Sequence, residues 1–265
     1  MKLRRHPANG VPAATLPRTL AVLLLLACTA APAREPDWSR LDALLAAHVQ
    51  PATLHGVTVN AVDYAGLATD QRLDDIIGTL QNHPLDALEG RAERLAFYIN
   101  AYNVLALAMV ADHLPLASIK DIGSVFRPVW KRTAGRLGGE DVSLDDIEHG
   151  RLRKLGDPRV HMAIVCASVS CPDLRTEAYR AARLDEQLDD QARRFLGNAG
   201  KGARRDGDTL AVSRIFDWFA EDFAVVGGVE AFIRRYREVP DEVDDIDASI
   251  DYDWRLNGSS GTPRS

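Results

Sequence analysis

Two cysteines that lie five positions apart, Cys166 and Cys171, are the residues of this sequence best suited to chemistry. They occur in VHMAIVCASVSCPDL, where an apolar run ends in a loop of small residues. A cysteine attacks as its thiolate, so a nucleophile needs a nearby base or a positive dipole. A pair at this spacing can instead form a disulfide or supply part of a metal site. The two residues therefore leave three interpretations open.

His149 is the candidate base for a Cys166 nucleophile. It follows SLDD at 143–146, a pattern typical of a capped helix start, and precedes the apolar run that leads to Cys166. The loop 167–170 is small and rich in N–H groups, so it could bind an oxyanion. His161 is too far from Cys166 along an extended strand to contact it. This set describes a thiol site with Cys166 and His149 as its catalytic pair.

The disulfide and the metal site would use the same residues differently. In an oxidising compartment, a disulfide between Cys166 and Cys171 is the simplest interpretation. It needs Cα atoms roughly 4.4 to 6.8 Å apart, so the loop between them has to fold back, as its small residues permit. A metal site would add His149 and His161, but the spacing matches no common zinc pattern. We therefore predict no metal ion and no cofactor.

The N-terminal segment 1–33 predicts export. It has a basic head, an unbroken apolar core from Leu20 to Ala27, and small residues after it, which is the form of a secretory signal. Cleavage would leave either Arg34 or a lipidated Cys28 as the first residue. The apolar run is shorter than the roughly 20 residues that span a membrane. We expect a periplasmic or cell-envelope protein, attached to the membrane only through a lipid on Cys28, if at all.

The acidic balance of the chain argues against nucleic acid as a partner. Residues 1–33 hold four basic and no acidic side chains, which leaves 28 Lys and Arg against 38 Asp and Glu, a net charge near −10. Phosphate binding needs a basic face. The carboxylates crowded between residues 241 and 253 are interpreted as a solvated face. We expect the partner to be an unknown small molecule or a peptide.

A second group of candidate residues lies in FYINAYN at 97–103. Asn100 and Asn103 share one face of a helix that is otherwise apolar, and buried amides must find partners. One of them could orient a catalytic imidazole or bind a substrate amide, or both could brace loop backbone against the helix. The candidate binding residues are taken from this motif and from the cysteine loop and its flank: Tyr98, Ser168, Ser170 and Arg175.

Periodicity predicts a helix-rich α+β single domain with a small central β-sheet, over residues 34–257. The segment after Asn257, residues 258–265, is predicted to be a disordered tail. Helices are expected at 37–48, 67–80, 93–113, after Ser143, at 184–196, after Ser213 and at 229–236. Extended segments are expected at 57–64 and 209–212, with a hairpin around Gly138-Gly139 and a central buried strand at 160–166.

Several of these stretches together resemble the family catalogued as domain-of-unknown-function family 547. They are FYINAYN (97–103), VSLDDIEHGRLR (142–153), PRVHMAIVCASVSCPDL (158–174), a helix at 187–196, VSRIFDWFAEDF (212–223) and DYDWRLN (251–257). The resemblance implies a bacterial envelope protein. It implies no particular reaction, because the family's activity is unassigned.

Two functions follow from this sequence. The first is a papain-like or transglutaminase-like hydrolase or acyl transferase acting on peptide or cell-wall amides, with Cys166, His149 and one of the two asparagines in its site. The second is a non-catalytic envelope module that binds a partner through the loop 167–175, with the Cys166–Cys171 disulfide as a staple. The enzyme requires Cys166 as a free thiol, whereas the binding module holds Cys166 in a disulfide.

Overall fold

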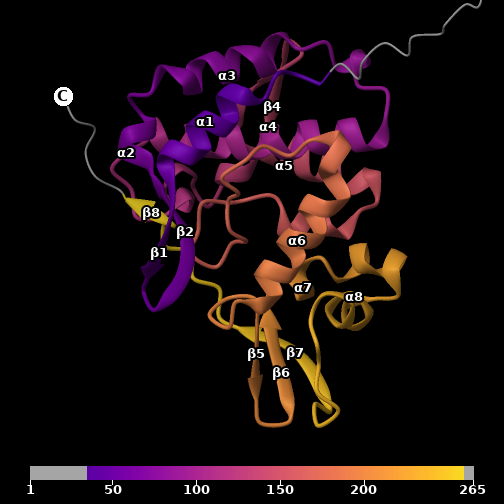
Figure 1. Ribbon diagram of the computed structural model, residues 1–265. Coiled ribbons are helices and arrows are strands. Elements are labelled where there is room, and N and C mark those ends of the chain that lie inside the picture. Colours follow the sequence, from indigo (N-terminus) through magenta and orange to yellow (C-terminus); the bar gives the residue numbers. More distant parts are fainter. Residues whose placement is uncertain (1–34, 260–265) are drawn as a thin grey trace, which may run out of the picture. The chain divides into compact units, whose positions relative to one another are not determined.

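The computed structural model describes residues 35–259, so the predicted signal and lipidation site lie outside the described residues. The α+β prediction is confirmed (Figure 1). The helices are α1 Ser39–His48, α2 Tyr64–Leu67, α3 Gln71–Asn82, α4 Arg91–Ala111, α5 Leu144–Ile147, α6 Leu184–Gly197, α7 Ile215–Trp218 and α8 Val229–Tyr236. The strands are β1 Val49–Leu54, β2 Val57–Asp63, β3 Thr133–Leu137, β4 Glu140–Ser143, β5 Ala203–Asp206, β6 Thr209–Ser213, β7 Asp245–Ile250 and β8 Gly258–Ser259.

The strands form three small sheets, where we expected one central sheet. The first has the order β1-β2-β8, the second is the β3-β4 hairpin, and the third has the order β5-β6-β7. In the first and third sheets, two strands adjacent in sequence pair antiparallel and a later strand joins in parallel. The predicted turn at Gly138-Gly139 is the turn of the β3-β4 hairpin, where both glycines have positive φ.

Helix α4 is the centre of the core, as its apolar sequence predicts. Every residue from Leu95 to Ala111 is buried. Among the described residues this is the one helix long and apolar enough to cross a membrane, but 94% of that stretch is buried inside the protein. Helix α3 packs on α4 and also contacts α1 (Figure 1). Such burial is typical of a core helix in a folded domain.

The predicted strand at 160–166 is wrong. Residues Pro158–Met162 form a 3₁₀ helix, and residues 163–166 belong to no strand. The reason lies in Asn103 of α4, whose side chain donates to the Ala163 carbonyl (3.0 Å) and accepts from the Val165 N–H (2.8 Å). Buried backbone groups need partners, and here an amide side chain replaces a sheet neighbour. The run is apolar because it is buried, although it is not extended.

The C-terminal segment is ordered beyond the point where we predicted disorder. Gly258 and Ser259 form β8, which pairs with β2, so the tail prediction is wrong for these two residues; 260–265 lie outside the described part. Just before β8, the chain runs along the cysteine loop. The Val169 N–H donates to the Arg255 carbonyl (2.9 Å), and the Asn257 N–H donates to the Ala167 carbonyl (3.1 Å). Segments far apart in sequence thus meet at the loop.

Candidate functional site

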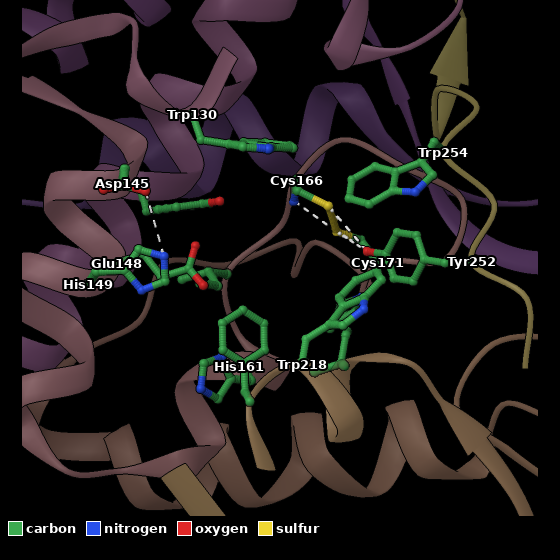
Figure 2. A pocket seen from close by; sticks show the side chains of 15 residues that line it. Trp130, Asp145, Glu148, His149, His161, Cys166, Cys171, Trp218, Tyr252 and Trp254 are labelled. Atoms are coloured by element: carbon green, nitrogen blue, oxygen red, sulfur yellow. Dashed lines mark hydrogen bonds and ion pairs between the residues drawn. A yellow bond between two sulfur atoms is a disulfide. The ribbon is translucent and has the colours of Figure 1, made fainter. Parts of the chain in front are cut away.

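A cavity of about 310 Å³ opens beside the cysteine loop (Figure 2). One side of it carries Asp145, Glu148 and His149, from α5 and the turn that follows it. The facing side is aromatic, and Cys166 lies between the two sides (Figure 2). The aromatic side is formed by Trp218, Tyr252 and Trp254, with Trp130 near Cys166 and a ring-centroid distance of 6.0 Å between Trp130 and Trp254. This arrangement places an apolar surface opposite hydrogen-bonding groups, as in small-molecule sites.

Cys166 and Cys171 form a disulfide, which confirms one of the three interpretations of the pair. Their Cα atoms are 6.2 Å apart, because the loop folds back with Ala167 at a positive φ of 59°. Both residues line the cavity, but Cys171 is only 3% exposed whereas Cys166 is half-buried. The Tyr252 hydroxyl donates to Cys171 Sγ (3.2 Å) and lies 3.3 Å from Cys166 Sγ. The disulfide is therefore part of the cavity wall.

The loop after Cys166 does not provide the oxyanion-binding N–H groups that we expected. The Val169 N–H donates to the Arg255 carbonyl, and the Ser170 N–H donates to the Asp253 carbonyl (3.2 Å). The Cys171 N–H donates to the Ser168 carbonyl (3.1 Å) within the loop. These donors are used by backbone, because the C-terminal segment pairs with the loop. The prediction of a free N–H nest in the loop 167–170 is wrong for Val169 and Ser170.

The two asparagines of α4 brace backbone, and their amides bond to no imidazole. Asn103 holds the chain just before Cys166, as described above. Asn100 does the same for Tyr179, donating to its carbonyl (2.8 Å) and accepting from its N–H (2.9 Å). Both side chains are buried. Asn103 is thus a positioning residue for the cysteine loop, whereas Asn100 positions a different segment.

His149 lines the same cavity as Cys166, but its ring faces other partners. Its Nδ1 accepts from the Arg153 guanidinium (2.9 Å), and its Nε2 lies 3.7 Å from Asp145 Oδ1. A ring nitrogen that accepts from a guanidinium carries no hydrogen, so the neutral ring has its hydrogen on Nε2. In this arrangement His149 offers a donor to the cavity. To accept a proton from Cys166, it would first have to leave Arg153.

Glu148 is a functional candidate that the sequence analysis missed. Burial raises the pKa of this carboxyl to about 7, and nearby Asp145 adds to the shift while Arg153 and the Tyr102 hydroxyl oppose it. The helix at this point widens into a π-helical turn, Glu148–Leu152, a feature frequent at functional sites. The signal was the Glu-His pair in the motif at 142–153, of which we considered only the histidine.

A cluster of half-buried charged side chains surrounds the buried His161, which lines the cavity beside Phe219. His161 Nε2 lies 2.7 Å from Asp222 Oδ2, and Arg153 makes two further bonds to the same carboxylate (2.6 and 2.8 Å). Burial lowers the pKa of His161 to about 4, although Asp222 opposes the shift. The ring stacks on Phe219 with 4.1 Å between centroids. His161 is therefore a neutral core histidine that fixes Asp222 and, through it, Arg153.

The remaining candidates are spread over the domain. Ser168 Oγ lies 3.4 Å from Cys166 Sγ, and Ser170 Oγ accepts from the Asp253 N–H (2.8 Å), so both support the loop. The Tyr98 hydroxyl accepts from Arg151 (3.3 Å), away from the cavity lining. Arg175 pairs with two acids, Glu177 and Asp190. Within residues 35–259, no three His, Cys, Asp or Glu side chains are grouped as a metal ion would require.

The fold and the site define an α+β protein with an aromatic cavity beside a disulfide. Residues 85–196 match the model of a domain family described as "Protein of unknown function, DUF547", which supports the family expected from the sequence. The match covers α4, Glu148 and both cysteines; Trp218, Tyr252 and Trp254 lie beyond it. Searches of curated proteins and of solved structures found no match.

Proposed function

We propose that this protein is an exported envelope protein that binds a small molecule or a peptide in its aromatic cavity. The observation that carries the proposal is the cavity itself, where aromatic rings face hydrogen-bonding side chains across about 310 Å³. The Cys166–Cys171 disulfide and the pairing of its loop with the C-terminal segment give the cavity a fixed wall. A preformed site loses less conformational entropy on binding than a mobile one.

The charges around the cavity favour a neutral or cationic ligand. Among the described residues, the cavity lining includes the carboxyl groups of Asp145 and Glu148 and no Lys or Arg side chain. An anion would meet these carboxyl groups with no cationic side chain in the described lining to pair with. Short peptides without net negative charge carry amide groups and apolar side chains, so we propose them as the ligand class to examine first.

Intrinsic fluorescence can test the proposal, because three of the four tryptophans line the cavity. We expect titration with synthetic neutral or cationic peptides of two to five residues to change the emission saturably. Trp218→Phe should weaken the apparent affinity, whereas Trp38→Phe, which removes the remaining tryptophan in the core, should not. A flat titration, repeated with calorimetry, would contradict binding of this ligand class.

A second proposal, a thiol-dependent hydrolase or acyl transferase, rests on the position of Cys166. Its sulfur borders the cavity, with the Tyr252 and Ser168 hydroxyls within 3.4 Å. The disulfide must be reduced before Cys166 can attack, and His149 must turn from Arg153 to serve as its base. Alkylation with iodoacetamide after mild reduction is the test. Rapid labelling of Cys166 that His149→Ala slows at neutral pH supports an activated thiol; labelling indifferent to His149 contradicts it.

Export is proposed from the segment 1–33 alone. Its basic head, apolar core and small residues have the form of a secretory signal. Intact-mass analysis of the envelope fraction should find a chain that begins at Arg34 or at a lipidated Cys28. Recovery of the full-length chain from the cytoplasm would overturn the proposal.

A further inference from the structure

We propose that the Cys166–Cys171 disulfide exchanges with thiols that enter the cavity, with Cys166 as the attacked sulfur and Cys171 as the leaving thiolate. The inference goes beyond ligand binding, because it assigns a two-electron reaction to the cavity wall. It does not depend on which ligand the cavity holds.

The first observation is the unequal exposure of the two cysteine residues. Cys166 is half-buried at the cavity, whereas Cys171 is 3% exposed. In Figure 2, Cys166 lies between Trp130 and Trp254. Thiol–disulfide exchange requires a thiolate to reach one sulfur, and the more accessible sulfur is the one attacked. Access therefore favours Cys166.

The second observation is that a backbone donor and a hydroxyl are placed to stabilise a Cys171 thiolate. The Cys166 N–H donates to Cys171 Sγ (2.9 Å). The Tyr252 hydroxyl lies 3.2 Å from Cys171 Sγ and 3.3 Å from Cys166 Sγ, so the backbone N–H is the donor that distinguishes the two sulfurs. Ser168 in turn donates to the Tyr252 oxygen (3.3 Å), which orients that hydroxyl toward sulfur. Hydrogen bonds to the charged form favour a thiolate, and a more stable thiolate leaves faster.

The third observation is that hydrogen bonds, as well as the disulfide, hold the loop 167–170 in position. The Ser170 N–H donates to the Asp253 carbonyl, and the Asp253 N–H donates back to Ser170 Oγ (2.8 Å). With the Val169–Arg255 bond, these contacts tie the loop to the C-terminal segment. Reduction therefore leaves the loop in place, and the donors keep their positions around Cys171.

The reaction balances with a thiol reductant. A thiolate attacks Cys166 Sγ, the Cys166–Cys171 bond breaks, and a mixed disulfide forms on Cys166. Cys171 leaves with the electron pair and is held by the Cys166 N–H and the Tyr252 hydroxyl. A second thiolate then attacks the reductant's sulfur in the mixed disulfide and releases Cys166 as a thiolate. Two thiols become one disulfide, and the protein gains two electrons and, at equilibrium, the protons of its thiols.

The test measures reduction of the native protein by glutathione and dithiothreitol, with acid quenching and mass spectrometry. We expect reduction well before unfolding, and a mixed disulfide with glutathione on Cys166. Tyr252→Phe should slow reduction about three- to tenfold and shift the equilibrium toward the disulfide, since the leaving thiolate loses a donor. Tyr236→Phe, which removes a buried hydroxyl bonded to Asp189 elsewhere, should react at the wild-type rate.

A second comparison does not depend on the stability of Tyr252→Phe. Each single serine variant leaves one free cysteine. Oxidised glutathione should modify the free Cys166 of Cys171→Ser rapidly. It should modify the free Cys171 of Cys166→Ser slowly. Reduction that proceeds only at the rate of global unfolding would overturn the proposal. Equal modification of both single variants would overturn the assigned order of the two sulfurs. An unchanged rate in a folded Tyr252→Phe would overturn the role of its hydroxyl in stabilising the leaving thiolate.

Discussion

Glu148 places in the cavity wall a carboxyl group that is partly protonated at neutral pH. Burial is the main cause, and the neighbouring carboxylate of Asp145 adds to it, so the pKa rises to about 7. At neutral pH this side chain can donate a hydrogen bond as well as accept one. A ligand that places an acceptor against Glu148 would favour the protonated form, and a cationic ligand would favour the charged form.

The first prediction concerns Glu148→Gln. The unfolded carboxyl titrates near 4.5 and the folded one near 7, so the folded state binds more protons between these values. Stability therefore falls as pH rises through this window, by at most about 3 kcal/mol. The cavity admits solvent, which reduces the effect. We therefore expect the free energy of unfolding of the glutamine variant to exceed that of the wild type by about 1 to 2 kcal/mol at pH 8 and by less at pH 4.5.

Urea unfolding at several pH values measures this difference. Glu140→Gln is the control, because Glu140 is an exposed residue whose side chain is 74% accessible. Its substitution should leave the slope of stability against pH unchanged. A Glu148→Gln variant whose advantage is the same at pH 4.5 and pH 8 would show that the carboxyl titrates normally.

Residue types alone identified part of this site. The sequence indicated Cys166, His149 and the disulfide, since chemically active side chains stand out from an apolar run. It did not indicate Glu148 or Tyr252, because their roles depend on neighbours that are distant in sequence. Tyr252 reaches sulfurs more than eighty positions away. A perturbed carboxyl looks like any surface glutamate until its surroundings are known.

At the scale of elements, α4 positions two separate segments through two equivalent side chains. Asn103 holds the chain at Ala163 and Val165, ahead of Cys166, and Asn100 holds Tyr179. The helix was predictable from its apolar sequence. The strand predicted at 160–166 was not formed, since hydrophobicity reports burial and does not say which group will pair with the backbone. An asparagine side chain took the place of a neighbouring strand.

The second prediction uses this matched pair. Asn103→Ala and Asn100→Ala each leave a buried carbonyl and N–H without partners, so each should lose on the order of 2 to 4 kcal/mol of stability. Only Asn103→Ala loosens the chain leading to Cys166. We expect it alone to change cavity tryptophan emission and to speed disulfide reduction under native conditions. Equal effects of both variants on these two readouts would contradict a local role for Asn103.

The third prediction concerns β8, the strand that anchors the C-terminal segment. A Cβ added at Gly258 would lie 2.0 Å from the Val62 carbonyl oxygen, so the alanine variant cannot keep this pairing with β2. We expect Gly258→Ala to lower stability by about 2 kcal/mol or more. Gly197→Ala, at the end of α6 with nothing within 4 Å, is the control and should be neutral. Thermal unfolding of both variants distinguishes a steric effect from a general cost of replacing glycine.

At the scale of the whole molecule, the cavity lies where two hydrophobic clusters meet. Ile164 and Cys166 pack with the cluster around α4, whereas Phe219 and Tyr252 pack with the cluster around α8. The single-domain, α+β class followed from length and periodicity. The division into three small sheets did not, because strand pairing between distant segments leaves little local signal. The family match ends at residue 196, before four of the aromatic residues that line the cavity.

The last prediction is that the segment 252–259 is required for a cooperative fold and for the cavity. It supplies Tyr252 and Trp254 to the cavity wall and buries Leu256. Its Asn257 accepts from the Tyr64 hydroxyl (2.7 Å), which ties it to the N-terminal part of the domain.

A chain ending at Asp251 loses these contacts together with β8, at a cost comparable to the roughly 5 to 15 kcal/mol by which a domain is stable. We expect it to lose its near-UV circular dichroism and cooperative thermal transition, while a chain ending at Ser259 keeps both. Adding a synthetic peptide of residues 252–259 at high concentration should restore part of the tryptophan signal. A chain ending at Asp251 that unfolds cooperatively at the wild-type temperature would show that the core folds independently and that this segment only covers it.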